Sequence, residues 1–184
     1  MNKIRYFTIA LDLDETVTMF LDYLIHEYNY QFNKQIKITD IKTWDLLPII
    51  GQKGMQLFCK QGFFNNLKPY PYAIEVVKEL NKKHNIHILT KPQNAITMVD
   101  KWCWIEEYMP FIKFEQVTMT SHKYDFIADI MIDDYDVYLD KFKINCGGKT
   151  IIMDRLYNQN YDYADFRTNN WISINSYIDT LSNN

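Results

Sequence analysis

The sequence predicts an α/β fold with a doubly wound parallel sheet and a small helical cap inserted after the first strand. Two observations support this prediction. Short apolar runs, which are typical of buried strands, alternate with segments whose apolar residues recur at helical spacing. Such alternation is typical of βαβ units, in which the strands lie parallel. In addition, no strand-like run occurs between Asp14 and Ile86, an interval that holds more chain than a simple crossover needs.

The strands and core helices follow from the spacing of apolar residues. The predicted strands are Tyr6–Leu11, Ile86–Leu89, Phe114–Met119, Ile130–Ile132 and Thr150–Met153. Helices of the core are predicted at Ala73–Lys83, Ala95–Tyr108, Val137–Phe142 and Ile174–Leu181. In the second of these helices, Met98, Trp102 and Ile105 form the stripe that is expected to face the sheet. Pro71 and Pro92 lie shortly before the first two helices, as is typical of helix starts.

Residues 17–68 are predicted to form the cap, and residues 1–16 together with 69–184 the core domain. Three helices are expected within the cap, from the spacing of their apolar residues: Thr18–Asn33, Ile38–Leu47 and Gln52–Phe63. Asn65–Tyr72, which contains two prolines, is expected to return the chain to the core.

Composition limits the class of protein. With 184 residues, of which 47% are hydrophobic and 23% charged, the chain has the size of one domain and an ordinary globular composition. Its net charge of −3 argues against binding to a nucleic acid polymer. The three cysteines are far apart, so neither a disulfide framework nor a zinc site is indicated, and a cytoplasmic location is expected. No apolar run predicts a membrane span, and the choice between monomer and homodimer stays open.

Asp12 and Asp14 follow the first predicted strand, within Ile9-Ala10-Leu11-Asp12-Leu13-Asp14-Glu15-Thr16-Val17. Acids two positions apart on an extended chain point to the same side. Two carboxylates held that close repel each other unless a cation lies between them. This arrangement therefore points to Mg²⁺-dependent phosphoryl transfer.

Three further features each follow a predicted strand, namely Thr90, Lys123 and the pair Asp133-Asp134. In open α/β sheets the ligand crevice lies outside the carboxyl ends of the strands, so these residues should converge with Asp12 and Asp14. Each alone has an ordinary explanation, because such a threonine often caps a helix, a lysine is usually solvated and paired aspartates often belong to turns. Their occurrence in order, each after a strand, favours a shared site.

With these four motifs, the sequence resembles the haloacid dehalogenase superfamily of phosphotransferases. It is similar in particular to the 5′(3′)-deoxyribonucleotidase family, through Phe63–Pro71, Leu89–Pro92, Trp102–Glu107, Thr120–Lys123 and Ala128–Asp134. There are two departures from the family pattern. Glu15 occupies a position where many nucleotidases of this family have glycine, and Lys91 replaces a residue that is often small. Either change could alter phosphate contacts or cap closure.

The resemblance implies a role for each motif residue. Asp12 would be the nucleophile, and Asp14 the general acid and base. Mg²⁺ would be bound by Asp12, by Asp14 through its main-chain carbonyl, and by one acid of the Asp133-Asp134 pair, with the choice between the two left open. Thr90 and Lys123 would hold the transferring phosphoryl group, and Lys91, next to Thr90, would also contact the substrate.

The resemblance also implies a substrate. It predicts a Mg²⁺-dependent phosphatase of (deoxy)ribonucleoside 5′-monophosphates, and of pyrimidine deoxynucleotides in particular. Phe20 lies eight residues after Asp12, where an aromatic ring of this family stacks on the nucleobase, although a place in the core of an amphipathic helix explains it equally well. Trp44 is a second aromatic residue of the cap with the same two interpretations.

Two other functions compete with this one. A phosphatase for another small phosphoester, such as a sugar phosphate, would use the same motifs. A phospho-receiver signalling domain also combines acids, a threonine and a lysine around Mg²⁺. Such domains are shorter, place their acid pair after the first strand and have no cap. Here the adjacent pair Asp133-Asp134 follows a late strand, and the cap is large. The full set of chemical residues also argues against an inactive scaffold.

Overall fold

The computed structural model describes residues 5–183, which form one six-stranded parallel sheet with helices on both faces. The strands are β1 Thr8–Leu11, β2 Asn85–Thr90, β3 Val117–Met119, β4 Ile130–Asp133, β5 Lys149–Met153 and β6 Phe166–Thr168. Their order in the sheet is β3-β2-β1-β4-β5-β6, so the direction of winding reverses between β1 and β4. This arrangement confirms the predicted doubly wound α/β fold.

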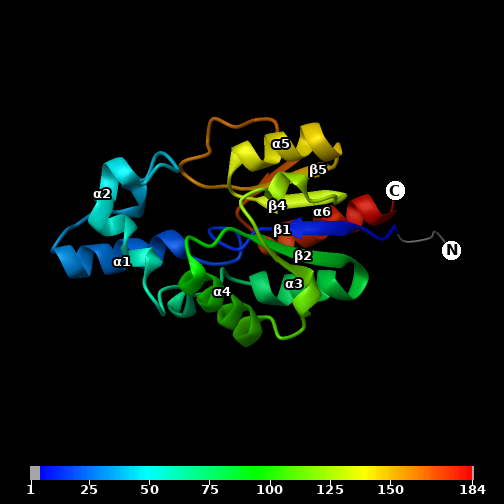
Figure 1. Cartoon of the computed structure of the whole chain (residues 1–184). Helices are drawn as coiled ribbons and strands as arrows, with labels where there is room; N and C mark the ends of the chain where they lie inside the picture. The colour runs from blue at the N-terminus through cyan, green and yellow to red at the C-terminus, as the bar shows by residue number, and fades with distance from the viewer. Residues whose placement is uncertain (1–4, 184) are drawn as a thin grey trace.

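Helices α3 Ala73–Lys83, α4 Ala95–Tyr108 and α6 Trp171–Asn183 pack on one face of the sheet, and α5 Asp136–Cys146 packs on the other (Figure 1). Side chains alternate along each strand. Ile9 and Leu11 of β1 belong to the cluster under the three helices, whereas Ala10 belongs to the cluster under α5. Because both faces of the central strands are covered, these strands are mostly apolar, and this is why the sequence revealed them.

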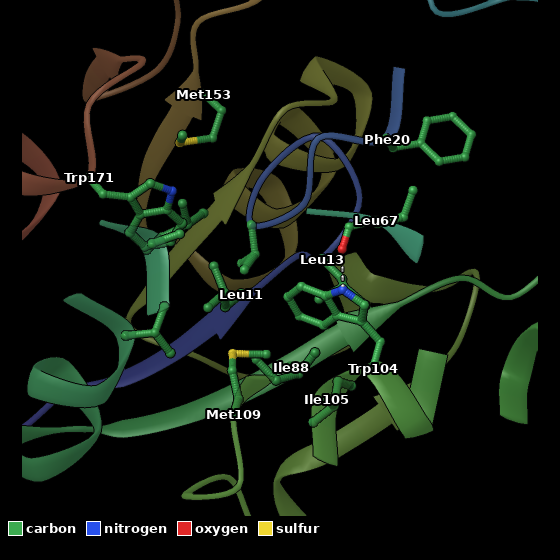
Figure 2. Packing of buried hydrophobic residues seen from close by; sticks show 14 of the residues in the cluster. Leu11, Leu13, Phe20, Leu67, Ile88, Trp104, Ile105, Met109, Met153 and Trp171 are labelled. Carbon is green, nitrogen blue, oxygen red and sulfur yellow. Dashed lines mark hydrogen bonds between the residues drawn. The ribbon is translucent and has the colours of Figure 1, made fainter. Parts of the chain in front are cut away.

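Two buried tryptophans hold the inserted segment to the core. The indole of Trp104, on α4, donates a hydrogen bond to the Leu67 carbonyl at 2.8 Å, which Figure 2 shows beside Leu13 and Ile88. The indole of Trp171, on α6, donates to the Thr16 carbonyl at 3.3 Å. Thr16 and Leu67 lie at the two ends of the insertion, so both connections are fixed to helices of the core.

Between β1 and α3, the described chain adds no strand to the sheet, and Figure 1 shows α1 and α2 away from the layered core. This segment contains α1 Phe20–Phe32, α2 Leu47–Met55 and the 3₁₀ turns η1 Ile38–Asp40, η2 Leu57–Cys59 and η3 Phe64–Asn66. Its two connections run side by side, because the Met19 amide donates to the Lys68 carbonyl and the Tyr70 amide to the Val17 carbonyl, each at 2.8 Å. The cap boundaries at residues 17 and 68 stay a prediction.

The predicted helices of the cap need correction. Ile38–Leu47 was predicted as a helix, but only the 3₁₀ turn η1 forms there. The helix predicted for Gln52–Phe63 begins earlier, at Leu47, because Pro48 lies in its first turn, and it ends at Met55. Gly51 interrupts it with a φ of 60°, a conformation that glycine adopts easily.

Other differences concern the ends of elements. Phe114–Gln116, predicted as part of a strand, forms the 3₁₀ turn η4 ahead of β3. Strand β6 was missed because it is short, half-buried and contains an arginine. Among residues 5–183, no helix has both the length and the apolar character needed to cross a membrane.

Asp165 joins β5 to β6 and supplies a pH-dependent part of the stability. Its carboxylate accepts hydrogen bonds from the Thr150 amide at 3.0 Å and the Lys149 ammonium at 2.8 Å, and it pairs with Lys143 at 3.1 Å. Burial alone would raise the pKa of Asp165, but these donors outweigh burial and hold the pKa well below its ordinary value.

Asp165→Asn should therefore lower the free energy of unfolding at pH 7 by about 1–2 kcal/mol. A depressed pKa stabilises the fold above the unfolded-state value of about 4, and the contribution is lost as the pH falls toward the lower folded-state value. Urea unfolding at pH 7 and between pH 3 and 4 should show the difference from the parent shrinking. Asp162→Asn, at an exposed position nearby, is the matched control. A difference that did not vary with pH would contradict the prediction.

Candidate active site

A cavity of about 370 Å³ opens at the carboxyl ends of the strands, where the sheet reverses its winding direction between β1 and β4. The core contributes charged residues to its wall, namely Asp12, Asp14, Lys123, Asp133 and Asp134. The inserted segment contributes mainly apolar ones, namely Phe20, Trp44, Leu46, Met55 and Phe58. The cavity is therefore charged at the sheet and aromatic toward α1 and α2.

Three buried aspartates meet at the charged end. Asp12 directly follows β1, and Asp133 ends β4, whose neighbour in the chain is Asp134. The Asp12 amide donates to the Ile132 carbonyl at 2.9 Å, which keeps the ends of β1 and β4 in register. One carboxylate oxygen from each of the three aspartates lies within 4.8 Å of the others. Among the described residues, this is the one acidic group with metal-ligand spacing.

Lys123 lies among these carboxylates. Its ammonium forms an ion pair with Asp12 and lies 3.2 Å from Asp133 Oδ2. Burial would lower the pKa of Lys123, but the charges of Asp12 and Asp133 outweigh burial and raise it. The positive charge of Lys123 thus offsets part of the negative charge of the aspartates.

Both acids of the pair have raised pKa values, and burial is the main cause. Burial raises the pKa of Asp133 to about 7, with Lys123 opposing the shift and Asp12 adding to it. Burial also raises the pKa of Asp134, and the charges of Asp133 and Asp12 raise it further. A buried group of oxygen ligands with excess negative charge fits a hard divalent cation.

Neighbouring donors orient both acids of the pair. The Tyr135 amide donates to Asp133 Oδ1 at 2.9 Å. Asp134 accepts from two hydroxyls, that of Tyr157 at 2.5 Å and that of Thr16 at 3.3 Å. Asp133 is thus held by a charged amine and an amide, whereas Asp134 is held by neutral hydroxyls.

Lys101, which the sequence analysis missed, joins two of the predicted residues. Its buried ammonium forms an ion pair with Asp14, donates to Thr90 Oγ1 at 2.8 Å and lies 4.4 Å from the centre of the Phe64 ring. The other oxygen of Asp14, Oδ1, is buried with no hydrogen-bond partner among the described residues, and Asp14 lines the cavity. That oxygen therefore has hydrogen-bonding capacity that the described residues do not use.

The missed signal lies in the stripe of α4. Met98 and Trp102 were expected to face the sheet, but Met98 is 44% exposed and Trp102 is half-buried. Ile105 of the predicted stripe is buried, and the other buried residues of α4 are Thr97, Asp100, Lys101 and Trp104. Lys101 lies at helical spacing from Thr97, Trp104 and Ile105. This spacing was the available signal that Lys101 is buried on the same side of α4 as the large apolar residues Trp104 and Ile105.

Thr90 and Lys91 have different surroundings. Thr90 ends β2, and its side chain is fully buried beside Lys101, outside the residues that line the cavity. Lys91 is exposed at the cavity wall, where its side chain can reach a bound molecule, and its main-chain carbonyl accepts from Lys101 at 3.3 Å.

Phe20 and Trp44 both line the cavity, and both also pack against other aromatic rings. Phe20 is buried, with ring centres of Phe58 and Phe64 at 5.4 and 6.0 Å. Trp44 is half-buried, with ring centres of Tyr157 and Tyr135 at 5.1 and 6.0 Å. Each of the two rings thus packs against other aromatic rings and also lines the cavity.

Residues 5–182 match the sequence profile of the family described as "5′ nucleotidase, deoxy (Pyrimidine), cytosolic type C protein". The chain belongs to this family. It is 28% identical over 178 residues to a 5′(3′)-deoxyribonucleotidase of Clostridium acetobutylicum, an alignment that covers 95% of this chain and 96% of the relative. It is 29% identical over 168 residues to a 5′(3′)-deoxyribonucleotidase of Bacillus subtilis, which covers 90% and 95%. The resemblance seen in the sequence is confirmed.

Solved structures confirm the fold of this nucleotidase family member. A haloacid dehalogenase-like hydrolase of Streptococcus pneumoniae superposes with a TM-score of 0.65 at 13% identity and covers 94% of this chain and 98% of its own. A haloacid dehalogenase hydrolase of Bacillus subtilis, described as bound to magnesium, has a TM-score of 0.59 at 12% identity and covers 95% and 99%. At these identities the likeness concerns the fold alone.

The Lys101–Asp14 pair should be strongly coupled in stability. Removing one partner leaves an uncompensated buried charge, so Lys101→Met should lower the free energy of unfolding by about 3 kcal/mol, and Asp14→Asn should also be destabilising. The double variant should lose at least about 1 kcal/mol less than the sum of the two single losses. Urea unfolding in metal-free buffer measures the cycle. The exposed pair Lys82–Glu79 serves as control and should show little coupling. Additive losses at Lys101 and Asp14 would contradict the pairing.

Proposed function

We propose that this nucleotidase family member hydrolyses deoxyribonucleoside 5′-monophosphates, preferring pyrimidine bases, to nucleoside and phosphate with Mg²⁺ as cofactor. The observation that carries the proposal is the composition of one cavity, which combines three buried aspartates and a lysine at one end with aromatic side chains at the other. A phosphate group would bind at the charged end, beside Lys123 and a cation held by the aspartates, and a nucleobase fits against the aromatic end. The relatives named as 5′(3′)-deoxyribonucleotidases support the same substrate.

The proposed Mg²⁺ ligands are Asp12, the main-chain carbonyl of Asp14 and Asp134. Asp134 is favoured over Asp133 because its carboxylate accepts only from neutral hydroxyls, whereas Asp133 is already paired with Lys123. When bound, Mg²⁺ would offset the negative charge of the carboxylates and of the substrate phosphate. The magnesium described in the Bacillus subtilis hydrolase of the same fold supports the choice of metal.

In the proposed mechanism, the Asp12 carboxylate attacks phosphorus, and the bond from phosphorus to the ester oxygen breaks as an aspartyl-phosphate forms. Asp14 donates its proton to the departing oxygen and then takes a proton from the water that cleaves the aspartyl-phosphate. Burial raises the pKa of Asp14 above its ordinary value, and the neighbouring ammonium of Lys101 opposes the shift. Lys123 would hold and neutralise the transferring group. Thr90 is fully buried outside the cavity lining and would act through Lys101, whose ammonium donates to its hydroxyl.

The aromatic end of the cavity is the proposed nucleoside site. Phe20 and Trp44 would contact the base, Lys91 would approach the substrate at the rim, and residues 17–68 would act as a cap that excludes bulk water. Leu46 and Met55 line the same wall. An apolar wall leaves a 2′-hydroxyl without a partner, which favours 2′-deoxy substrates.

Phosphate release from a panel of substrates tests the proposal. With Mg²⁺ present, pyrimidine 2′-deoxyribonucleoside 5′-monophosphates should give a higher kcat/KM than sugar phosphates do. Asp12→Asn is nearly isosteric and should lower kcat at least about a thousandfold, while the control Asp162→Asn should not. Faster turnover of sugar phosphates than of every nucleotide would overturn the substrate, and an active Asp12→Asn enzyme would overturn the mechanism.

Metal removal is a separate test. Chelation with EDTA should abolish phosphate release, and added Mg²⁺ should restore it. Because a ligand that binds only the folded state stabilises it, Mg²⁺ should also raise the melting temperature of the metal-free protein. Asp134→Asn should lose most of that rise. Full activity in excess chelator would exclude a required cation.

A further inference from the structure

Glu15, the residue after Asp14, has a main-chain conformation that its side chain disfavours. Its φ is 54°, in the left-handed region, where a residue with a Cβ is strained. Among the described residues, three that are not glycine have positive φ, namely Glu15, Asn33 and Tyr72. Asn33 and Tyr72 cap helices, at the end of α1 and the start of α3. Glu15 lies in a loop, so other contacts must hold its conformation.

Arg155, which follows β5, supplies those contacts. Its Nε and Nη2 donate to the Glu15 main-chain carbonyl at 3.0 and 2.6 Å. The same Nε lies 3.3 Å from Glu15 Oε2, and the guanidinium carbon lies 4.2 Å from the centre of the Tyr70 ring. Two guanidinium nitrogens that donate to one carbonyl fix the orientation of the peptide between Glu15 and Thr16 far better than a single donor would.

The Glu15 carboxylate extends the contact to the cap. It is almost completely buried and accepts from the Leu21 amide at 2.6 Å, in the first turn of α1, which has no side-chain cap of its own. It also accepts from the Tyr70 hydroxyl at 2.8 Å, on the segment that returns from the cap. Glu15 therefore ties the loop of Asp14 to the beginning of α1 and to the returning chain.

We infer that Arg155 is a positioning residue for the active site: it holds Glu15 in the left-handed conformation and so fixes the peptide that joins Asp14 to Glu15. That peptide carries the Asp14 carbonyl, the proposed metal ligand, so this inference rests on the proposed function. Through the Glu15 carboxylate, the same contacts fix the start of α1, where Phe20 is the first residue. Glu15 does not line the cavity, so it acts through its neighbours.

Glycine at position 15 offers a decisive comparison. Glycine adopts positive φ without strain, so a chain with glycine there does not need the arginine. If Arg155 acts by holding the conformation of Glu15, then removing Arg155 should weaken Mg²⁺ binding only while residue 15 is glutamate. If Arg155 acts only by packing, replacing Glu15 with glycine should not repair its loss.

The experiment measures Mg²⁺ binding to the full-length, metal-free protein by isothermal titration calorimetry, at a temperature where thermal melts show each variant folded. Arg155→Met should raise the Kd for Mg²⁺ about 10-fold, at the lower end of the effects seen when groups that orient metal ligands are removed. Adding Glu15→Gly to Arg155→Met should restore the Kd to within about threefold of the parent. Asp165→Asn, a destabilising change that does not touch Glu15, should leave the Kd within about twofold of the parent.

Kinetics give a second readout. Arg155→Met should raise KM for a deoxynucleotide more than KM for p-nitrophenyl phosphate, because the small substrate does not extend to Phe20. If Arg155→Met does not fold, Arg155→Lys takes its place, with an expected loss of about threefold in Mg²⁺ affinity, because an ammonium cannot grip the carbonyl from two sides.

Parent-like Mg²⁺ affinity in folded Arg155→Met, or in its lysine replacement, would overturn the inference. So would a folded double variant that binds as weakly as Arg155→Met. If the parent binds Mg²⁺ and the variants behave as expected but no nucleotide is hydrolysed, the proposed substrate fails and the role of Arg155 stands. A parent that does not bind Mg²⁺ overturns the proposed metal and this inference together.

Discussion

The burial of several carboxylates at one point is the constraint on which the rest of this structure depends. Asp12, Asp133 and Asp134 are all buried where β1 and β4 end, and Lys123 is the direct ionic partner of Asp12 and Asp133. Desolvation disfavours every one of these charges. The surrounding hydroxyls, amides and lysine reduce that penalty, and a divalent cation would remove most of what is left. Features that are unfavourable for folding alone are thus retained where the proposed chemistry needs them.

Burying these charges needs rigid surroundings, and the packing supplies them. Main-chain pairing between β1 and β4 sets the spacing of Asp12 and Asp133. The segment that completes the cavity is inserted shortly after Asp14, so its attachment affects the geometry of the acids. Trp104 and Trp171 hold the two ends of that segment from helices on one face of the sheet. Apolar packing and the orientation of the charged groups are therefore parts of one arrangement.

The sequence predicted the acid cluster because parallel strands all end at the same edge of a sheet, so residues after β1 and β4 meet whatever the loops do. It did not predict Lys101, because a helical residue reaches the site only if its face of the helix points there. The predicted stripe through Met98 gave the wrong buried face for α4. The start of α2 was signalled by Pro48 and overlooked. The hydrogen bonds between Arg155 and Glu15 join residues 140 positions apart, and no local sequence pattern predicts such a contact.

The side-by-side course of the two cap connections has an evolutionary consequence. Because Met19 pairs with Lys68 and Tyr70 pairs with Val17, the chain leaves the core and re-enters it at nearly the same point. Whatever lies between these residues can change in length or shape without altering the order of the strands. Such a junction allows one catalytic scaffold to acquire new substrate pockets by exchanging a single surface module, while the residues that perform the chemistry stay in place.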